Sequence, residues 1–192
     1  MSSSATPYGA RPVGTLSASG SFSGKVRHYS IASGYATSIF YGDFVKLVAA
    51  GGVEKDTGTT ACTPVGIFLG VSYTDPNTSQ KTFSQMWTAS VVASDATAYV
   101  IDDPDVLFEM QADGTAAQTV IGNNAAVALT AGSTSIGTSK NVVDISTIAV
   151  TATLPIRIVD ISSKSGNAAG DSYTDLVVKF NAGHIMRNTT GI

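Results

Sequence analysis

The fold is decided by a block of alternating sequence that runs from Val65 to Gly114. Its strand-like segments are VGIFLGV (65–71), TFSQMW (82–87), YVI (99–101) and VLFEM (106–110). Turn signals separate them at DPN (75–77) and DDPD (102–105). Short segments with a two-residue period, cut by Pro, Gly, Asn and Asp, are typical of antiparallel strands joined by tight turns. The block therefore predicts a mainly β fold whose body is an antiparallel β-barrel or β-sandwich.

The large side chains of this block are the predicted core. In the last segment Val106, Phe108 and Met110 share one face of an extended chain, and Glu109 and Gln111 share the other. We expect the single Trp, Trp87, to lie in the core with its neighbours Phe83 and Met86, because aromatic residues contribute much buried apolar area. The alternative is that these three form an exposed aromatic strip that binds sugar or protein.

Composition narrows the class of protein. The chain has 192 residues, enough for one sizeable domain, and 43% of them are hydrophobic. Only 13% are charged, about half the usual fraction, and the net charge is −3. A nucleic-acid binder needs clustered Lys and Arg, so we expect no direct nucleic-acid partner. No apolar run is long enough to span a membrane, and no apolar segment at the N-terminus predicts a secretory signal.

Along the chain, three parts are expected. Residues 1–24 are an extended N-terminal arm rich in Ser, Gly and Ala, residues 25–185 are the β-rich body, and residues 186–192 are a C-terminal tail. A weak subdivision is possible near Gly114, and one short helix is expected at residues 116–121 with Gly122 as its cap. The arm is too small and polar to order itself, so we expect a partner to hold it. Its binding anchors are predicted to be Tyr8, Arg11, Pro12 and Phe22.

The inventory of reactive residues is thin. There are two histidines and one cysteine, and no hydrolase elbow, phosphate-binding loop or zinc motif occurs. Asp102, Asp103 and Asp105 are expected to form a turn instead of a metal site. Cys62 is expected to be a buried, unreactive thiol, and His184 a loop residue with a local hydrogen bond. The sequence therefore predicts no catalytic residue, no metal, no cofactor and no enzyme, although a hydrolase that uses a carboxylate pair in a cleft remains open.

Residues 40–185 resemble small capsid proteins of tailed bacteriophages, the decoration or cement proteins of the head shell. The segments that carry the resemblance are VGIFLGVSYTDP (65–76), KTFSQMW (81–87), YVIDDPDVLFEMQADG (99–114), IGNNA (121–125), GSTSIGTS (132–139), LPIRIVD (154–160) and GDSYTDLVVKFNAGH (170–184). The resemblance implies a β-rich body with an extended arm, bound outside the head shell as a dimer or trimer. It also implies synthesis in the host bacterial cytoplasm and residence in the virion.

Two functions are therefore expected from the sequence. The first is a structural virion protein that binds the major capsid protein and other copies of itself, with a homotrimer favoured over a homodimer. It would cross-link neighbouring capsid subunits on the outer surface of the head. The alternative is a carbohydrate-binding or host-adhesion β-domain, such as a head fibre, whose aromatic platform would include Trp87.

Overall fold

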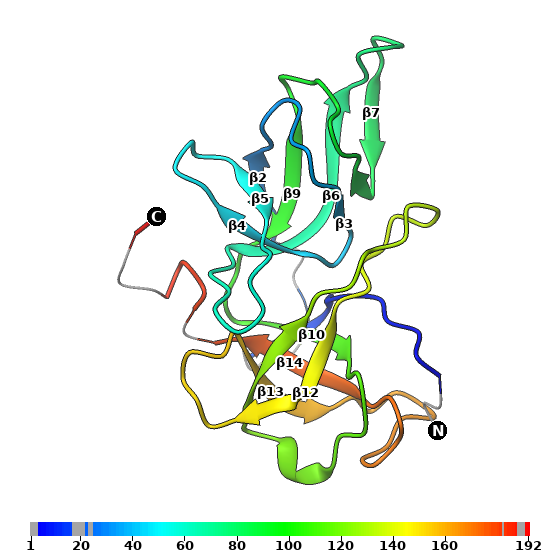
Figure 1. Cartoon of the computed structure of the whole chain (residues 1–192), viewed down its shortest axis with the longest axis vertical. Coiled ribbons are helices and arrows are strands. Elements are labelled where there is room, and N and C mark those ends of the chain that lie inside the picture. The colour runs from blue at the N-terminus through cyan, green and yellow to red at the C-terminus, as the bar shows by residue number, and fades with distance from the viewer. Residues whose placement is uncertain (1–3, 17–21, 23–24, 182, 188–190) are drawn as a thin grey trace.

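The chain folds into two larger antiparallel sheets and one small one (Figure 1). The computed structural model describes residues 4–16, 22, 25–181, 183–187 and 191–192. Strands make up 41% of the chain, which confirms the mainly β prediction. The sheets are sandwich-like and form no closed barrel among the described residues.

Sheet A, the lower part of Figure 1, has six strands. In spatial order they are β1 (Arg11–Thr15), β10 (Val106–Gln111), β14 (Asp175–Phe180), β13 (Ile156–Ile161), β11 (Asn124–Ala128) and β12 (Val142–Ala149). Its first strand comes from the predicted arm and the rest from the second half of the chain. The predicted alternation in β10 is confirmed, since Val106, Phe108 and Met110 all lie in the core.

Sheet B, the upper part of Figure 1, is built from strands between residues 27 and 101. Its strands in order are β2 (Arg27–Ser30), β9 (Thr97–Ile101), β6 (Gly66–Thr74), β4 (Phe44–Leu47) and β5 (Val53–Lys55), and β7 (Lys81–Ser84) also pairs with β6. A small third sheet pairs β3 (Ile39–Phe40) with β8 (Met86–Trp87). The chain passes from sheet B to sheet A at the acidic turn between β9 and β10, before Gly114.

Strand β6 is the centre of sheet B, as its apolar sequence predicts. It pairs with β9 along one edge and with β4 and β7 along the other. Gly66 permits the close approach of β9, because a Cβ atom there would lie only 2.0 Å from the Ile101 carbonyl oxygen. Seven of the nine residues of β6 are buried, so the strand is covered on both faces.

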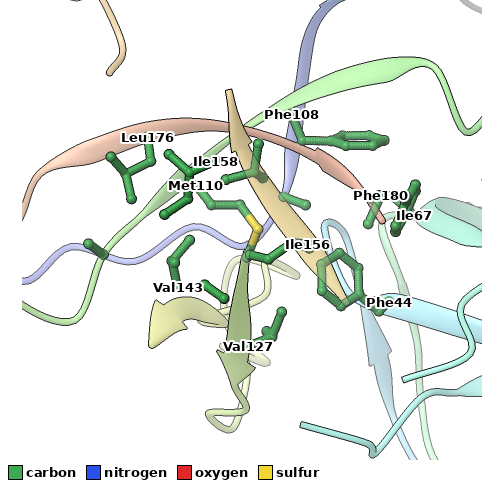
Figure 2. Packing of buried hydrophobic residues seen from close by; sticks show 14 of the residues in the cluster. Phe44, Ile67, Phe108, Met110, Val127, Val143, Ile156, Ile158, Leu176 and Phe180 are labelled. Carbon is green, nitrogen blue, oxygen red and sulfur yellow. The ribbon is translucent and has the colours of Figure 1, made fainter. Parts of the chain in front are cut away.

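The two sheets share apolar contacts at their junction. The sheet A core is the cluster of buried side chains that includes Phe108, Met110, Ile156, Ile158, Leu176 and Phe180. Phe44 and Ile67, which come from sheet B strands, lie in this cluster as well (Figure 2). The Phe44 and Phe180 rings are 5.7 Å apart. Residue 45, the next along β4, belongs to a separate sheet B core with Phe68, Tyr73 and Trp87. Strand β4 therefore packs against both cores.

Trp87 lies in the core, as predicted, but Phe83 does not. The Trp87 side chain is fully buried, and its Nε1 donates to the Tyr35 carbonyl at 3.2 Å. Phe83 is 72% exposed, so the prediction that it joins the core is wrong. The reason is a change of partner at Gln85. Strand β7 pairs with β6, whereas β8 pairs with β3, and the alternation does not continue from one to the other.

The predicted helix at residues 116–121 is reduced to one 3-10 turn at Gln118–Val120. No side chain caps its N-terminus. Isolated turns of helix are unfavourable without such caps or a packed face, because the first hydrogen bond fixes several residues. Gly122 follows with a φ of +87°, a conformation that suits glycine.

A buried carboxylate at the start of β4 joins four segments. Asp43 is 0% exposed, and its Oδ2 lies 2.8 Å from Lys55 Nζ in β5. Its Oδ1 accepts hydrogen bonds from Ser139 Oγ at 2.6 Å and from Asn141 Nδ2 at 3.1 Å. The Phe40 amide donates to Oδ2 at 3.0 Å. These contacts attach β5 and the loop before β12 to the junction of the two sheets.

We expect Asp43→Ala to lower the free energy of unfolding by about 3–5 kcal/mol, because it leaves the Lys55 charge without a partner in a buried site. Urea denaturation of the purified protein measures this loss. Asp160→Ala, which removes an exposed carboxylate from β13, is the matched control and should change stability by less than about 0.5 kcal/mol. Equal effects of the two substitutions would contradict the role assigned to Asp43.

Candidate functional site

The acidic residues singled out by the sequence stabilise turns and strand ends. Asp103 Oδ1 accepts a hydrogen bond from the Asp105 amide at 2.9 Å, which confirms the predicted turn. Asp102 is buried and binds Arg27 Nε at 2.8 Å and the Tyr29 hydroxyl at 2.9 Å. Burial and this carboxylate raise the pKa of Tyr29 to about 12. Within the described part of the chain, no three His, Cys, Asp or Glu side chains gather to hold a metal ion.

Cys62 is buried, as expected for an unreactive thiol. Its Sγ donates to the Gly58 carbonyl at 2.6 Å. Burial raises the pKa of the thiol to about 12, and the nearby carboxylate of Asp56 adds to this effect. The thiolate is the reactive form of cysteine, so this environment disfavours nucleophilic chemistry at neutral pH.

His184 is fully buried beside Phe180, with ring centroids 4.8 Å apart. Its Nδ1 accepts a hydrogen bond from the Met186 amide at 3.2 Å, which confirms the predicted local bond. Its Nε2 is buried and makes no hydrogen bond of good geometry to the residues that the structure describes. Burial lowers the pKa of His184 to about 4, and the Val65 carbonyl, which favours the charged form, offsets this only in part.

This burial predicts a pH-dependent stability. The imidazole of His184 binds a proton near pH 6.5 in the unfolded chain and only near pH 4 in the folded chain. The contribution of neutral His184 to the free energy of unfolding is therefore complete above pH 6.5, and it is lost as the pH falls towards 4. The loss should reach about 1.4 kcal/mol per pH unit within that window. His184→Asn keeps a hydrogen-bond acceptor for the Met186 amide and should flatten the dependence between pH 6.5 and 5, as urea titrations at each pH would measure. Parallel profiles for the two proteins would contradict this account.

The described part of the N-terminal arm is held by sheet A of the same chain. Strand β1 pairs antiparallel with β10, with Arg11 opposite Glu109 and Pro12 opposite Phe108. The Thr6 amide donates to Gln111 Oε1 at 2.9 Å, and the Ala10 amide donates to the Gly42 carbonyl at 3.0 Å. Residues 4–16 therefore have contacts within the same chain that the composition did not predict, and binding of the arm to a partner stays a prediction.

The arm supplies hydrogen bonds to buried acids of sheet A. Arg11 forms an ion pair with Glu109, whose Oε1 also accepts from Ser162 Oγ at 2.5 Å. The Tyr8 hydroxyl donates to Asp175 Oδ1 at 2.9 Å. Burial favours protonation of Glu109, but the Ser162 and Arg11 contacts outweigh it and hold its pKa below the ordinary value. Burial, and then the neighbouring carboxylates, raise the pKa of Tyr8 well above its ordinary range. We call these contacts the arm latch.

The four predicted anchors all have contacts within the chain. Tyr8 and Arg11 belong to the arm latch, Pro12 lies in β1, and Phe22 is partly buried against the sheet A core. Their role in binding a partner stays a prediction. The sequence could not show that Glu109 and Gln111, on the polar face of β10, are also buried. The segment that covers these two side chains is the N-terminal arm, which lies about a hundred residues earlier in the sequence.

Loss of the arm latch should loosen β1. We expect Arg11→Ala to destabilise the protein by about 1–2 kcal/mol, because Glu109 stays buried without its counter-charge while the arginine itself is half exposed. Hydrogen exchange of the β1 and β10 amides should become faster than in the wild type. Adding Glu109→Gln to Arg11→Ala removes the unpaired charge and should restore part of the protection. Unchanged exchange in the single variant would refute the arm latch.

Sheet B carries a group of ring side chains, of which the sequence singled out Phe83 alone, as a core residue or as part of an exposed aromatic strip. His28 pairs with Tyr99 across β2 and β9, and their rings meet edge to face at 4.9 Å. Phe83 lies on β7 opposite Ser72. Together with Leu69, the residues His28, Tyr99 and Phe83 form what we call the aromatic face. Two polar residues, Lys81 and Gln85, lie two positions from Phe83 and so share its face of the strand, and they are the signal that could have placed it outside the core.

A hollow of about 280 Å³ lies on the aromatic face. Its lining is Leu69, Gly70, Val71, Phe83, Ser84, Gln85 and Tyr99. Phe83 and Tyr99 thus border one concave site, although they lie on different strands. The site combines apolar walls with a few polar groups, the usual composition of ligand pockets.

Comparison with known proteins found no matching family model, no matching curated protein and no matching solved structure. Among the described residues, no helix is long and apolar enough to cross a membrane.

Proposed function

We propose that this chain is a structural virion protein, a decoration protein that binds the outside of a phage head and cross-links neighbouring major capsid subunits. The resemblance of residues 40–185 to decoration proteins supports the proposal. A structural role needs no acidic side chain free for catalysis. The observed contacts are compatible with such a role, because Asp43, Asp102, Glu109 and Asp175 each bind other parts of the fold.

The observation that carries the proposal is that both sheets present exposed apolar side chains. Val92, in the loop between β8 and β9 of the sheet B half, is 67% exposed. Val150, directly after β12 in sheet A, is 88% exposed. Single exposed apolar side chains are common on protein surfaces, but a cross-linking protein needs contacts at two separate places, and these two valines lie in different halves of the body.

The junction between the sheets suits a bridging role. Phe44 and Ile67 extend from sheet B strands into the sheet A core, and the Asp43 contacts lie beside them. A packed and ion-paired junction resists hinge motion, so force applied to one sheet is passed to the other. Such a body holds two capsid subunits at a fixed separation.

Oligomerisation would increase the strength of binding. In a homotrimer, or alternatively a homodimer, modest contacts act together because the first contact raises the effective concentration of the others. The arm can add to these contacts through Val13 and Leu16, which are both exposed. The protein would reside on the outer capsid surface of the virion.

We expect the purified protein to co-sediment with undecorated phage heads and to saturate at a ratio set by the capsid lattice. Val92→Asp and Val150→Asp should each weaken binding at least about tenfold, since each places a charge in an apolar contact. Thr115→Asp adds the same charge at an exposed polar position of the sheet A half and should bind normally.

Failure of the wild-type protein to bind heads would overturn the proposal. Binding by both valine variants with wild-type affinity would remove the bridging mechanism. The free oligomer, measured by analytical ultracentrifugation, decides between the trimer and the dimer.

The alternative function is a carbohydrate-binding or adhesion domain, for which the sequence suggested Trp87 as part of an exposed aromatic platform. Trp87 is buried and cannot stack against a ligand. The aromatic face offers a different set of rings, Phe83 and Tyr99, on the rim of the hollow.

A further inference from the structure

The hollow on the aromatic face has a floor of bare backbone. Gly70 lies opposite Tyr99 in the pairing of β6 with β9, at a place where the register shifts. Its φ is +157°, and a Cβ atom added there would lie 2.8 Å from the Ser84 carbonyl oxygen. Glycine at this position therefore lets the backbone of β7 approach β6 closely, which places Ser84 and Tyr99 on either side of the Gly70 backbone.

The walls of the hollow are aromatic and its rim is polar. Phe83 is largely exposed on one wall, and Tyr99 forms another, held in place by its hydroxyl, which donates to Ser72 Oγ at 3.0 Å. Gln85 lines the hollow and is exposed. No hydrogen bond of its side-chain amide to another described residue is found, so this group is available to a ligand.

None of the described lining residues carries a charge. On β7 the only charged side chain is Lys81, whose ammonium group is 2.9 Å from Asp95 Oδ2. A charged ligand would therefore lose its hydration without gaining a counter-charge. A neutral ligand is favoured, provided that it can stack against an aromatic ring and exchange hydrogen bonds with an amide.

We propose that this hollow binds one pyranose ring of a neutral saccharide. A pyranose has a face of C–H groups that packs against an aromatic ring, and hydroxyl groups at its edge that pair with an amide in both directions. Phe83 supplies the aromatic ring on which the pyranose stacks. Tyr99 and Leu69 lie beside the pyranose, and Gln85 forms hydrogen bonds with its hydroxyl groups. The volume of about 280 Å³ is at the small end of ligand pockets and suits a single ring.

This saccharide site goes beyond the decoration role and does not depend on it. The decoration proposal concerns contacts with capsid subunits through Val92 and Val150, neither of which lines the hollow. A protein on the outer surface of a head can carry both sites, and each can be removed without the other.

The test is a nuclear magnetic resonance titration of the full-length, isotope-labelled protein. The probes are the methyl pyranosides of glucose, galactose and mannose together with N-acetylglucosamine. We expect saturable shifts in the amides of residues 69–71, 83–85 and 99 for at least one sugar. The Kd should be on the order of 1 mM, as for other small polar ligands with few contacts. Trp fluorescence is a poor probe here because the single Trp is buried.

Matched variants separate this site from general effects. Phe83→Ala should weaken binding about tenfold, and Gln85→Ala should weaken it without changing the fold, since both side chains are exposed. Val92→Asp, outside the hollow, should bind sugar normally. Head binding by Phe83→Ala should remain, so failure of one proposal does not imply failure of the other. No saturable shift with any of the four sugars, or equal affinity in Phe83→Ala, would overturn the saccharide site.

Discussion

The buried carboxylate of Asp43 is the contact on which the arrangement of the two sheets depends. It lies at the start of β4, where it binds Lys55 of β5, the loop before β12 and the amide of Phe40. The next two side chains of β4 diverge, since Phe44 enters the sheet A core and Val45 the sheet B core. A buried charge must keep its partners, because an unpaired one is costly in a medium of low polarity. The need to keep the Asp43 carboxylate paired therefore holds the start of β4 in place. From there Phe44 enters one core and Val45 the other.

The same principle explains the arm. Residues 4–16 form few apolar contacts, yet they are positioned by Glu109, Gln111 and Asp175, each of which is buried and receives a hydrogen bond from the arm. Acids that a catalytic site would leave available are therefore engaged in holding distant segments together. The surface also carries exposed apolar groups, Val92 in the sheet B half and Val150 in the sheet A half, and the rings of the aromatic face.

The sequence predicted those parts of the fold that depend on local periodicity. Strands β6, β10 and β14 follow from runs of apolar residues, and Trp87 was correctly assigned to the core. The alternation misplaces Phe83, because its strand ends before Gln85 and the chain then pairs with another sheet. A two-residue period cannot reveal this change of partner. The Asp43–Lys55 pair and the cover over Glu109 were not predicted, since they depend on long-range contacts. The hollow over Gly70 joins three strands and likewise has no local signature.

We propose that one body with contacts on both sheets bridges neighbouring capsid subunits. An electron cryo-microscopy reconstruction of phage heads incubated with the purified protein would show whether this bridge forms. The account predicts density for both sheets on the outer surface of the shell, with the region of Val92 and the region of Val150 each against a different capsid subunit. Density attached through one sheet alone, or a shell without added density at saturating protein, would contradict it.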